Sequence, residues 1–227
     1  DELVSLVERA LADAGWDDAP SAPRARRTTD PAAVVGGAIE AIDRPLEQVN
    51  LMIGMPGLLA SDRRRSHLSV MNTVLGAGMS SRLFQEVRER RGLAYSVYSY
   101  SSLYSDAGSF GMYAGCTPAK AGEVARIMLG ELDRLASDGV TDEELVRAKG
   151  QIAGASALAL EDSDSRMSRL GRAELTMGEF SDLDAVLAAV DRVTGDDVRA
   201  IAAELAGGRR SIAAVGPVRG GVFAGLA

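Results

Sequence analysis

The sequence predicts an α+β fold in which a mostly antiparallel sheet is covered by helices. Strand-like segments occur in neighbouring pairs, and these pairs are interleaved with pairs of helical segments instead of alternating strictly strand by helix. Aromatic residues make up only 4% of the 227 residues, so Ala, Val, Leu, Ile and Met must do most of the packing, which favours helix-rich layers.

The first 31 residues predict a helix followed by a linker. Apolar residues from Leu3 to Ala14 recur at helical spacing, and Gly15 ends the pattern, so residues 1–15 are expected to form an amphipathic helix. Residues 16–31 hold three of the seven prolines among charged and small polar residues, which is typical of a linker. We expect one domain over residues 32–227.

Five segments of that domain have strand-like sequences: 34–42, 46–55, 94–104, 109–116 and 211–216. The first two are separated by Asp43, Arg44 and Pro45, and we expect them to form a hairpin. The next two flank a turn at 106–108, which predicts a second hairpin. The last segment, SIAAVG, is predicted to close the sheet.

Helical spacing of apolar residues predicts helices near 61–75, 81–91, 124–135, 141–160, 166–175, 183–190 and 194–206. Ser61 or Asp62 is the predicted cap of the first of these, and Ser80 is the predicted cap of the second. Thr141 and Glu144 have the spacing of a capping box at the start of the fourth helix.

Charge and composition disfavour several classes of partner. A net charge of −7 disfavours binding to phosphate backbones, so no nucleic acid is expected. Cys116 is the single cysteine and cannot form an internal disulfide, so nothing calls for an oxidising compartment. No apolar run approaches the roughly 20 residues that span a bilayer, and the first residues lack a signal-peptide pattern. We expect a cytoplasmic protein that does not enter a membrane.

A single histidine, His67, limits the metal chemistry of the chain. A catalytic zinc site normally takes three protein ligands, most often including two histidines, and HLSVM offers neither Glu nor a second His at ligand spacing. We interpret His67 as a residue on a helix face. No Gly-x-Ser-x-Gly elbow supports a Ser-His-acid triad. The chain alone is expected to bind no metal.

A glycine-rich turn is the first candidate for chemistry. LGAGMSSRLF places Gly78 and Ser80 before a helix, where backbone N–H groups can hold an anion, and both residues are candidate substrate contacts. A flexible turn between helices is the simpler explanation. The missing strand and Gly-Lys-Ser/Thr pattern argue against a nucleotide.

Aromatic residues provide the second candidate, because all five tyrosines fall in the second predicted hairpin: Tyr95, Tyr98, Tyr100, Tyr104 and Tyr113. Amphipathic aromatic side chains gather where a surface meets a ligand or partner, although strand propensity explains the same cluster. Tyr98 and Tyr100 are candidate substrate contacts.

Arg88 and Tyr95 form the third candidate. Arg88 lies near the end of a predicted helix and Tyr95 near the start of the next strand, so both side chains can face one cleft. The alternative is a solvated Arg that stabilises the carboxyl end of its helix.

The segment GAGMSSRLFQEVRERRGLAYSV, residues 76–97, resembles a motif in the carboxyl-terminal half of insulinase/pitrilysin-type zinc peptidases, the group that includes mitochondrial processing peptidase. The resemblance implies that the fold is one half-domain of a clamshell and that residues 1–31 join the two halves. It also implies that zinc is bound by a His-x-x-Glu-His motif in an amino-terminal half absent from this sequence.

In the family that this segment resembles, an Arg-x6-Tyr pattern contributes to the active site. The pattern maps onto Arg88 and Tyr95, so the resemblance implies that these are catalytic residues that contact the substrate and the oxyanion. The implied partners are the amino-terminal catalytic half or subunit and a peptide substrate, and a homo-oligomer is compatible with the pattern. The expected function is that of the non-zinc half of a metalloendopeptidase. Two alternatives stay open: a non-catalytic scaffold or partner subunit, and a free-standing peptide-binding module.

Overall fold

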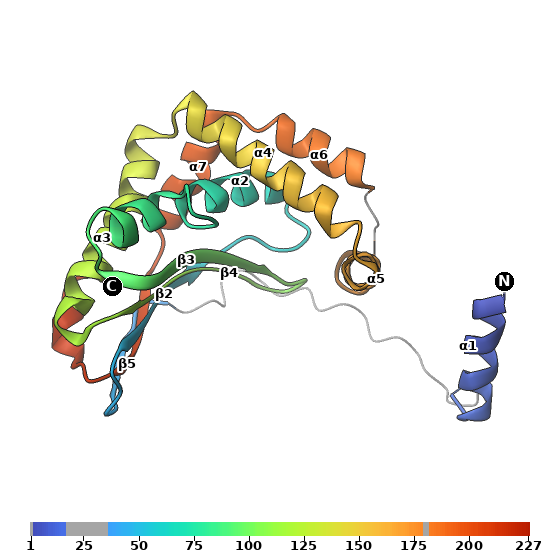
Figure 1. The fold of residues 1–227 in the computed structure, drawn as a ribbon, viewed down its shortest axis with the longest axis horizontal. Helices are drawn as coiled ribbons and strands as arrows, with labels where there is room; N and C mark the ends of the chain where they lie inside the picture. The colour runs from blue at the N-terminus through green and yellow to red at the C-terminus, as the bar shows by residue number, and fades with distance from the viewer. Residues whose placement is uncertain (1, 17–35, 179–181) are drawn as a thin grey trace.

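The computed structural model describes residues 2–16, 36–178 and 182–227 of the chain. Its centre is a five-stranded sheet with helices layered over one face, which confirms the predicted α+β class (Figure 1). The strands lie in the order β1 (Ile39–Asp43), β5 (Ser211–Gly216), β2 (Val49–Pro56), β4 (Gly108–Cys116) and β3 (Ala94–Leu103). All neighbours in this order are antiparallel except β1 and β5, which are parallel.

The predicted hairpin of the first two strands is wrong. Strand β5 lies between them and pairs with both, so that Ile212 is opposite Ile39 on one side and Ile53 on the other. The apolar strand β5 buries Ile212 and Ala214, whereas β1 exposes most of its residues. The more apolar strand therefore takes the interior position, and the more polar strand takes the edge.

The second predicted hairpin is confirmed. Strands β3 and β4 pair antiparallel along their length, and the Tyr104 N–H donates to the carbonyl of Ala107 across the connection. Strand β3 lies at one end of the strand order, so its outer edge has no partner strand among the described residues.

The described helices are α1 (Glu2–Asp13), α2 (Arg65–Leu75), α3 (Ala121–Asp138), α4 (Asp142–Ala159), α5 (Ser163–Arg172), α6 (Leu183–Asp191) and α7 (Gly195–Gly207), with shorter turns of other types between them. The predicted capping box of Thr141 and Glu144 is present at the start of α4. Helix α1 buries none of its residues. Apart from Trp16, the predicted linker at 16–31 lies outside the described residues.

Two predicted helix caps are wrong. The residue before α2 is Arg64, and neither Ser61 nor Asp62 caps the helix, because the Asp62 carboxylate instead accepts the Arg64 backbone N–H at 2.8 Å within the preceding turn. The next helical turn begins only at Arg82, and no side chain caps it. Ser80 is thus left within the turn.

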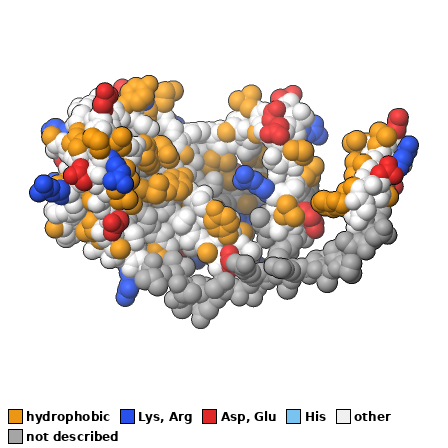
Figure 2. Space-filling view, turned by 90° about the horizontal axis from the view of Figure 1, so that it is seen from below, with side chains coloured by type: hydrophobic (Ala, Val, Ile, Leu, Met, Phe, Trp, Pro, Cys, Tyr) orange, Lys and Arg blue, Asp and Glu red, His pale blue; other side chains and the backbone are white. Residues whose placement is uncertain are grey.

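The core fills the space between the sheet and the helices α2, α3 and α7. The largest fully buried side chains include Phe110, Leu51 and Met112 from the sheet and Met128 and Leu132 from α3. The opposite face of the sheet is not covered by the described helices (Figure 1). Figure 2 looks from that side and shows apolar side chains beside a hollow in the surface. None of the helices described is long and apolar enough to cross a membrane.

A close contact joins the end of α2 to the middle of β3. A Cβ atom on Gly76 would lie 2.4 Å from the backbone nitrogen of Ser99, far inside van der Waals contact. This approach allows the Ser99 N–H to donate to the Gly76 carbonyl at 3.3 Å, and the buried Ser99 hydroxyl to donate to Asn72 Oδ1 at 2.7 Å. The loop that follows Gly76 is therefore fixed against the sheet.

We predict that Gly76→Ala destabilises the fold, because the added methyl group meets backbone and not a flexible side chain. The loss in free energy of unfolding should be about 1–3 kcal/mol, the usual cost of overpacking. The matched control is Gly130→Ala in α3, where a Cβ meets nothing within 4 Å. That variant should gain up to about 1 kcal/mol from helix propensity. Equal stabilities of the two variants in chemical denaturation would contradict the contact.

Candidate functional site

Arg88 lies in a π-helical turn, η2 (Phe84–Glu89), where the sequence predicted an ordinary α-helix. The Arg90 N–H donates to the Gln85 carbonyl five residues earlier at 2.9 Å, so the turn contains one residue more than an α-helical turn. The guanidinium carbon of Arg88 lies 4.8 Å from the centroid of the Phe84 ring. Such turns recur at functional sites, where they redirect a side chain.

Tyr95 lies in a β-bulge at the start of β3. Ala94 pairs with Cys116 and Ser96 pairs with Gly115, so Tyr95 is an extra residue in the ladder. Its side chain is 76% exposed, and its ring centroid lies 4.8 Å from the guanidinium carbon of Arg88. The structure therefore brings together the two residues that the sequence proposed as catalytic.

The stacked arrangement leaves the hydrogen-bonding edge of Arg88 available. Its guanidinium lies over two aromatic rings, and within the described part of the chain its acidic partner is Glu89, at 3.8 Å from Nε. A guanidinium carries five N–H donors around its rim, which stacking does not consume. Arg88 and Tyr95 thus present hydrogen-bond donors side by side on the surface.

Three of the tyrosines form a group on the uncovered sheet face. The ring of Tyr98 lies 5.0 Å from that of Tyr113 and 6.2 Å from that of Tyr100. The Tyr113 hydroxyl donates to Asn50 Oδ1 at 2.7 Å, and the Tyr100 hydroxyl contacts Met52 Sδ at 3.2 Å. Burial raises the pKa of Tyr100 and of Tyr113, so both hydroxyls stay protonated at neutral pH. The group forms an aromatic surface with half-exposed Tyr98 at its centre.

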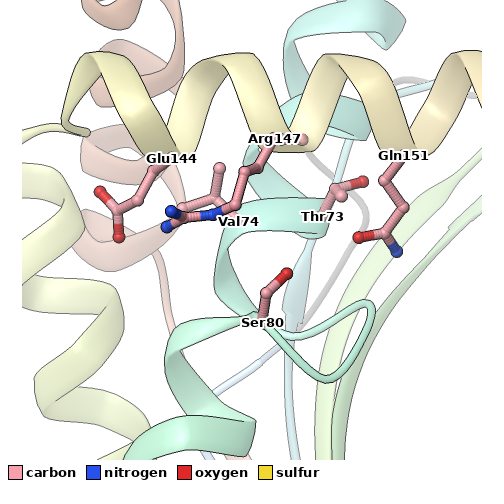
Figure 3. A pocket seen from close by; sticks show the side chains of 7 residues that line it. Thr73, Val74, Ser80, Glu144, Arg147 and Gln151 are labelled. Carbon is pink, nitrogen blue, oxygen red and sulfur yellow. The ribbon is translucent and has the colours of Figure 1, made fainter.

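Gly78 and Ser80 lie against α4 instead of beside the tyrosines. Gly78 has a φ of 137°, and the Gln151 side chain of α4 packs beside it and donates to the Ala77 carbonyl. Ser80 lines a cavity of about 10 Å³ between this loop, α2 and α4 (Figure 3). That volume fits about one water molecule, so the cavity is too small for a peptide side chain.

An ion pair between Arg82 and Glu144 connects the helical turn that carries Arg88 to α4. Arg82 donates from Nε and Nη2 to the two carboxylate oxygens of Glu144 at 2.7 and 2.8 Å, and both side chains are mostly buried. The Arg82 guanidinium lowers the pKa of the Glu144 carboxyl, which also belongs to the capping box of α4. This bidentate pair restricts how the π-helical turn can move.

The residues described do not fit a zinc ion. His67 lies 3.7 Å from the Asp197 carboxylate, and no group of three or more His, Cys, Asp or Glu side chains within 2–16, 36–178 and 182–227 is placed to hold a metal. Cys116 is buried, and burial raises the pKa of its thiol to about 11, which disfavours the thiolate that binds metals.

The sequence analysis missed Phe84, Asn50 and Met52. Phe84 lies four residues before Arg88, and aromatic and cationic side chains at that spacing on a helix are neighbours, so the spacing was a usable signal. Asn50 and Met52 meet the tyrosines only because β2 pairs with β4, and the predicted hairpin of β1 with β2 concealed that pairing.

Comparison with known proteins finds a matching family profile and several similar proteins. Residues 1–152 match the profile described as the peptidase M16 inactive domain. Proteins named uncharacterized zinc protease are similar to the chain: one from Streptomyces coelicolor is 51% identical over 200 residues, covering 88% of this chain and 43% of the relative. Another, from Mycobacterium leprae, is 40% identical over 218 residues, covering 96% and 48%. The chain thus spans less than half the length of these relatives.

A solved structure has the same fold. The crystal structure of a peptidase M16 inactive domain from Pseudomonas fluorescens aligns with a TM-score of 0.77 at 25% identity, over 87% of this chain and 47% of the other. The resemblance inferred from residues 76–97 is confirmed by these matches. Because the family profile covers well over half of its residues, the chain belongs to the peptidase M16 family, as an inactive domain of that family.

Proposed function

We propose that this chain is the half of a zinc metalloendopeptidase that binds no zinc, and that it supplies substrate contacts and transition-state stabilisation. The stacked pair of Arg88 and Tyr95 carries this proposal, because a π-helical turn and a β-bulge direct the two side chains to one exposed place. Irregular backbone of this kind is costly and is kept where it positions functional groups. The zinc protease names of the relatives support the proposal.

The proposed role of the pair is to stabilise negative charge. When water adds to the carbonyl of a peptide bond, the carbonyl oxygen becomes an oxyanion. The N–H edge of Arg88 and the hydroxyl of Tyr95 are donors suited to that oxygen, and stacking between Phe84 and Tyr95 holds the guanidinium before substrate arrives. Donors that need no rearrangement stabilise the transition state more than the bound substrate.

The proposed substrate is an extended peptide that adds to the outer edge of β3. This edge belongs to a ten-residue strand that has no partner strand among the described residues. The Ser99 N–H already donates to the Gly76 carbonyl, so a peptide can pair with the remaining outward backbone groups of β3. Tyr98 and Tyr100 on the uncovered face would contact alternate side chains of that peptide. Gly78 and Ser80 are exposed in the loop before η2, and we propose that they contact the substrate from the solvent side of that loop and not through the small cavity beside α4.

The proposed partner is an amino-terminal half, in the same polypeptide or in a separate subunit, that supplies the zinc and the general base. Helix α1 exposes Leu3, Leu6 and Val7 along one apolar face, which is suited to packing on such a half. We infer a clamshell chamber between the halves, and whole units of this kind can also form a homo-oligomer. A single cysteine, buried and unpaired, fits the proposed cytoplasmic location.

In the full-length protein, Arg88→Ala and Tyr95→Phe should each lower kcat by about 10²–10³-fold, the usual cost of losing one oxyanion donor. Their melting temperatures should stay close to wild type, because exposed side chains usually contribute less than about 0.5 kcal/mol to stability. Steady-state kinetics on a fluorogenic peptide and thermal denaturation provide the two measurements.

The matched controls are Arg91→Ala and Tyr104→Phe, which remove an exposed Arg from the same helix end and an exposed Tyr from the same hairpin. Both controls should retain kcat within about twofold of the wild type if only Arg88 and Tyr95 touch the reacting group. If Arg88→Ala and Tyr95→Phe leave turnover unchanged while stability falls, the pair is structural. The scaffold alternative would then replace the peptidase proposal.

Strand addition predicts a period of two in the substrate. Methylation of one backbone nitrogen should weaken binding by roughly twofold to tenfold at alternate positions, because each affected N–H loses one hydrogen bond to β3. Methylation at the intervening positions of the peptide should weaken binding less. Competition assays with a series of singly methylated peptides measure this pattern, and an even response along the peptide would exclude pairing with the edge.

A further inference from the structure

A second cavity, of about 530 Å³, opens between α2, α4, α5 and α6, and neither Arg88 nor Tyr95 lines it. Cavities that hold small ligands or side chains usually fall between about 300 and 1,000 Å³. None of the residues proposed to contact the substrate lines this cavity, so the cavity can have a separate role.

The polar wall of the cavity is strongly basic. Arg63 lies in the turn before α2, Arg65 is the first residue of α2, and Arg169 and Arg172 belong to α5. Hydroxyl groups come from Ser66, Ser69 and Ser156, and no Asp or Glu is among the described residues of the lining. Four guanidinium groups therefore line one cavity of a chain whose net charge is −7.

The arginines have interactions within the chain, yet a guanidinium serves several partners. Arg65 donates from Nη1 to the Ala60 carbonyl at 2.8 Å, and Arg65, Arg169 and Arg172 each have a further interaction in the structure. Each group carries five N–H donors in a planar fork, and such a fork can bind the two oxygens of a carboxylate.

The rest of the wall is apolar and comes from Ile152, Val186, Val190 and neighbouring alanines. The cavity therefore suits a ligand that combines a carboxylate with aliphatic groups, and its volume exceeds that of a bare anion.

We propose that this cavity binds carboxylate groups of an acidic, partly apolar peptide segment and gives the protein a preference for acidic substrates. The proposal rests on the proposed function, because it takes the ligand to be the peptide that Arg88 and Tyr95 act on. The carboxylate can come from Glu or Asp side chains or from a free carboxyl terminus, and these sources have the same chemistry.

The test compares three fluorescent peptides that bind to the full-length protein, under conditions where mass spectrometry finds the peptides uncleaved. The first alternates leucine with glutamate and has both ends blocked, the second replaces every glutamate by glutamine, and the third is the glutamine peptide with a free carboxyl terminus. Fluorescence anisotropy should give a dissociation constant at least about tenfold lower for the first or third peptide than for the second. Equal affinities for all three would overturn the proposal.

The variant Arg169→Gln/Arg172→Gln should remove most of this preference without changing the affinity for the glutamine peptide. The matched control is Arg166→Gln. Arg166 is an exposed residue of the same helix, α5, but its side chain does not line the cavity. If the double variant does not fold, Arg63→Gln tests the opposite wall. Loss of the preference in Arg166→Gln to the same extent would show that general charge is responsible and would overturn the proposal.

The binding measurement separates this proposal from the peptidase proposal. Arg88→Ala should keep the preference for the acidic peptide, because Arg88 does not line the cavity. If Arg88→Ala loses turnover but no peptide shows a carboxylate preference, the cavity proposal is wrong and the peptidase proposal stands. If the acidic peptide is preferred but turnover does not depend on Arg88, the cavity binds carboxylates and the catalytic role proposed for Arg88 is wrong.

Discussion

The contact between Gly76 and Ser99 is the constraint from which the arrangement of the candidate site follows. It ties the end of α2 to the middle of β3 through hydrogen bonds from the Ser99 N–H and hydroxyl, and only glycine allows the backbones to approach so closely. The chain between these two points contains the loop at 76–81, the π-helical turn and the start of β3. Both ends of this segment are fixed, and within it the Arg88 guanidinium lies over the Tyr95 ring.

That segment gains function by departing from regular structure. A π-helical turn and a β-bulge each insert one residue, and each insertion turns a side chain that a regular helix or strand would direct elsewhere. The Arg82–Glu144 ion pair then holds the turn against α4. The polar groups that we propose for catalysis therefore lie on a support of buried contacts, which keeps them in place without substrate.

Much of the fold follows from local sequence patterns, and what does not follow depends on distant pairing. The capping box at Thr141 and the β3–β4 hairpin were predictable because their signals lie within a few residues. The position of β5 between β1 and β2 was not predictable, because it depends on competition among strands that are far apart in the chain. Arg88 and Tyr95 were singled out by their places at a predicted helix end and strand start, and the family resemblance implied their catalytic role. The Phe84 contact and the basic cavity required the three-dimensional structure.

The central claim is that Arg88 binds the transition state more strongly than the substrate. The most direct measurement compares a phosphinic peptide, which mimics the tetrahedral intermediate, with the corresponding uncleaved peptide on full-length wild-type protein and on Arg88→Ala. We expect the variant to lose about 10²–10³-fold in affinity for the phosphinic peptide and less than about threefold for the ordinary peptide. Equal losses for both ligands would mean that Arg88 only binds substrate, and would contradict the claim.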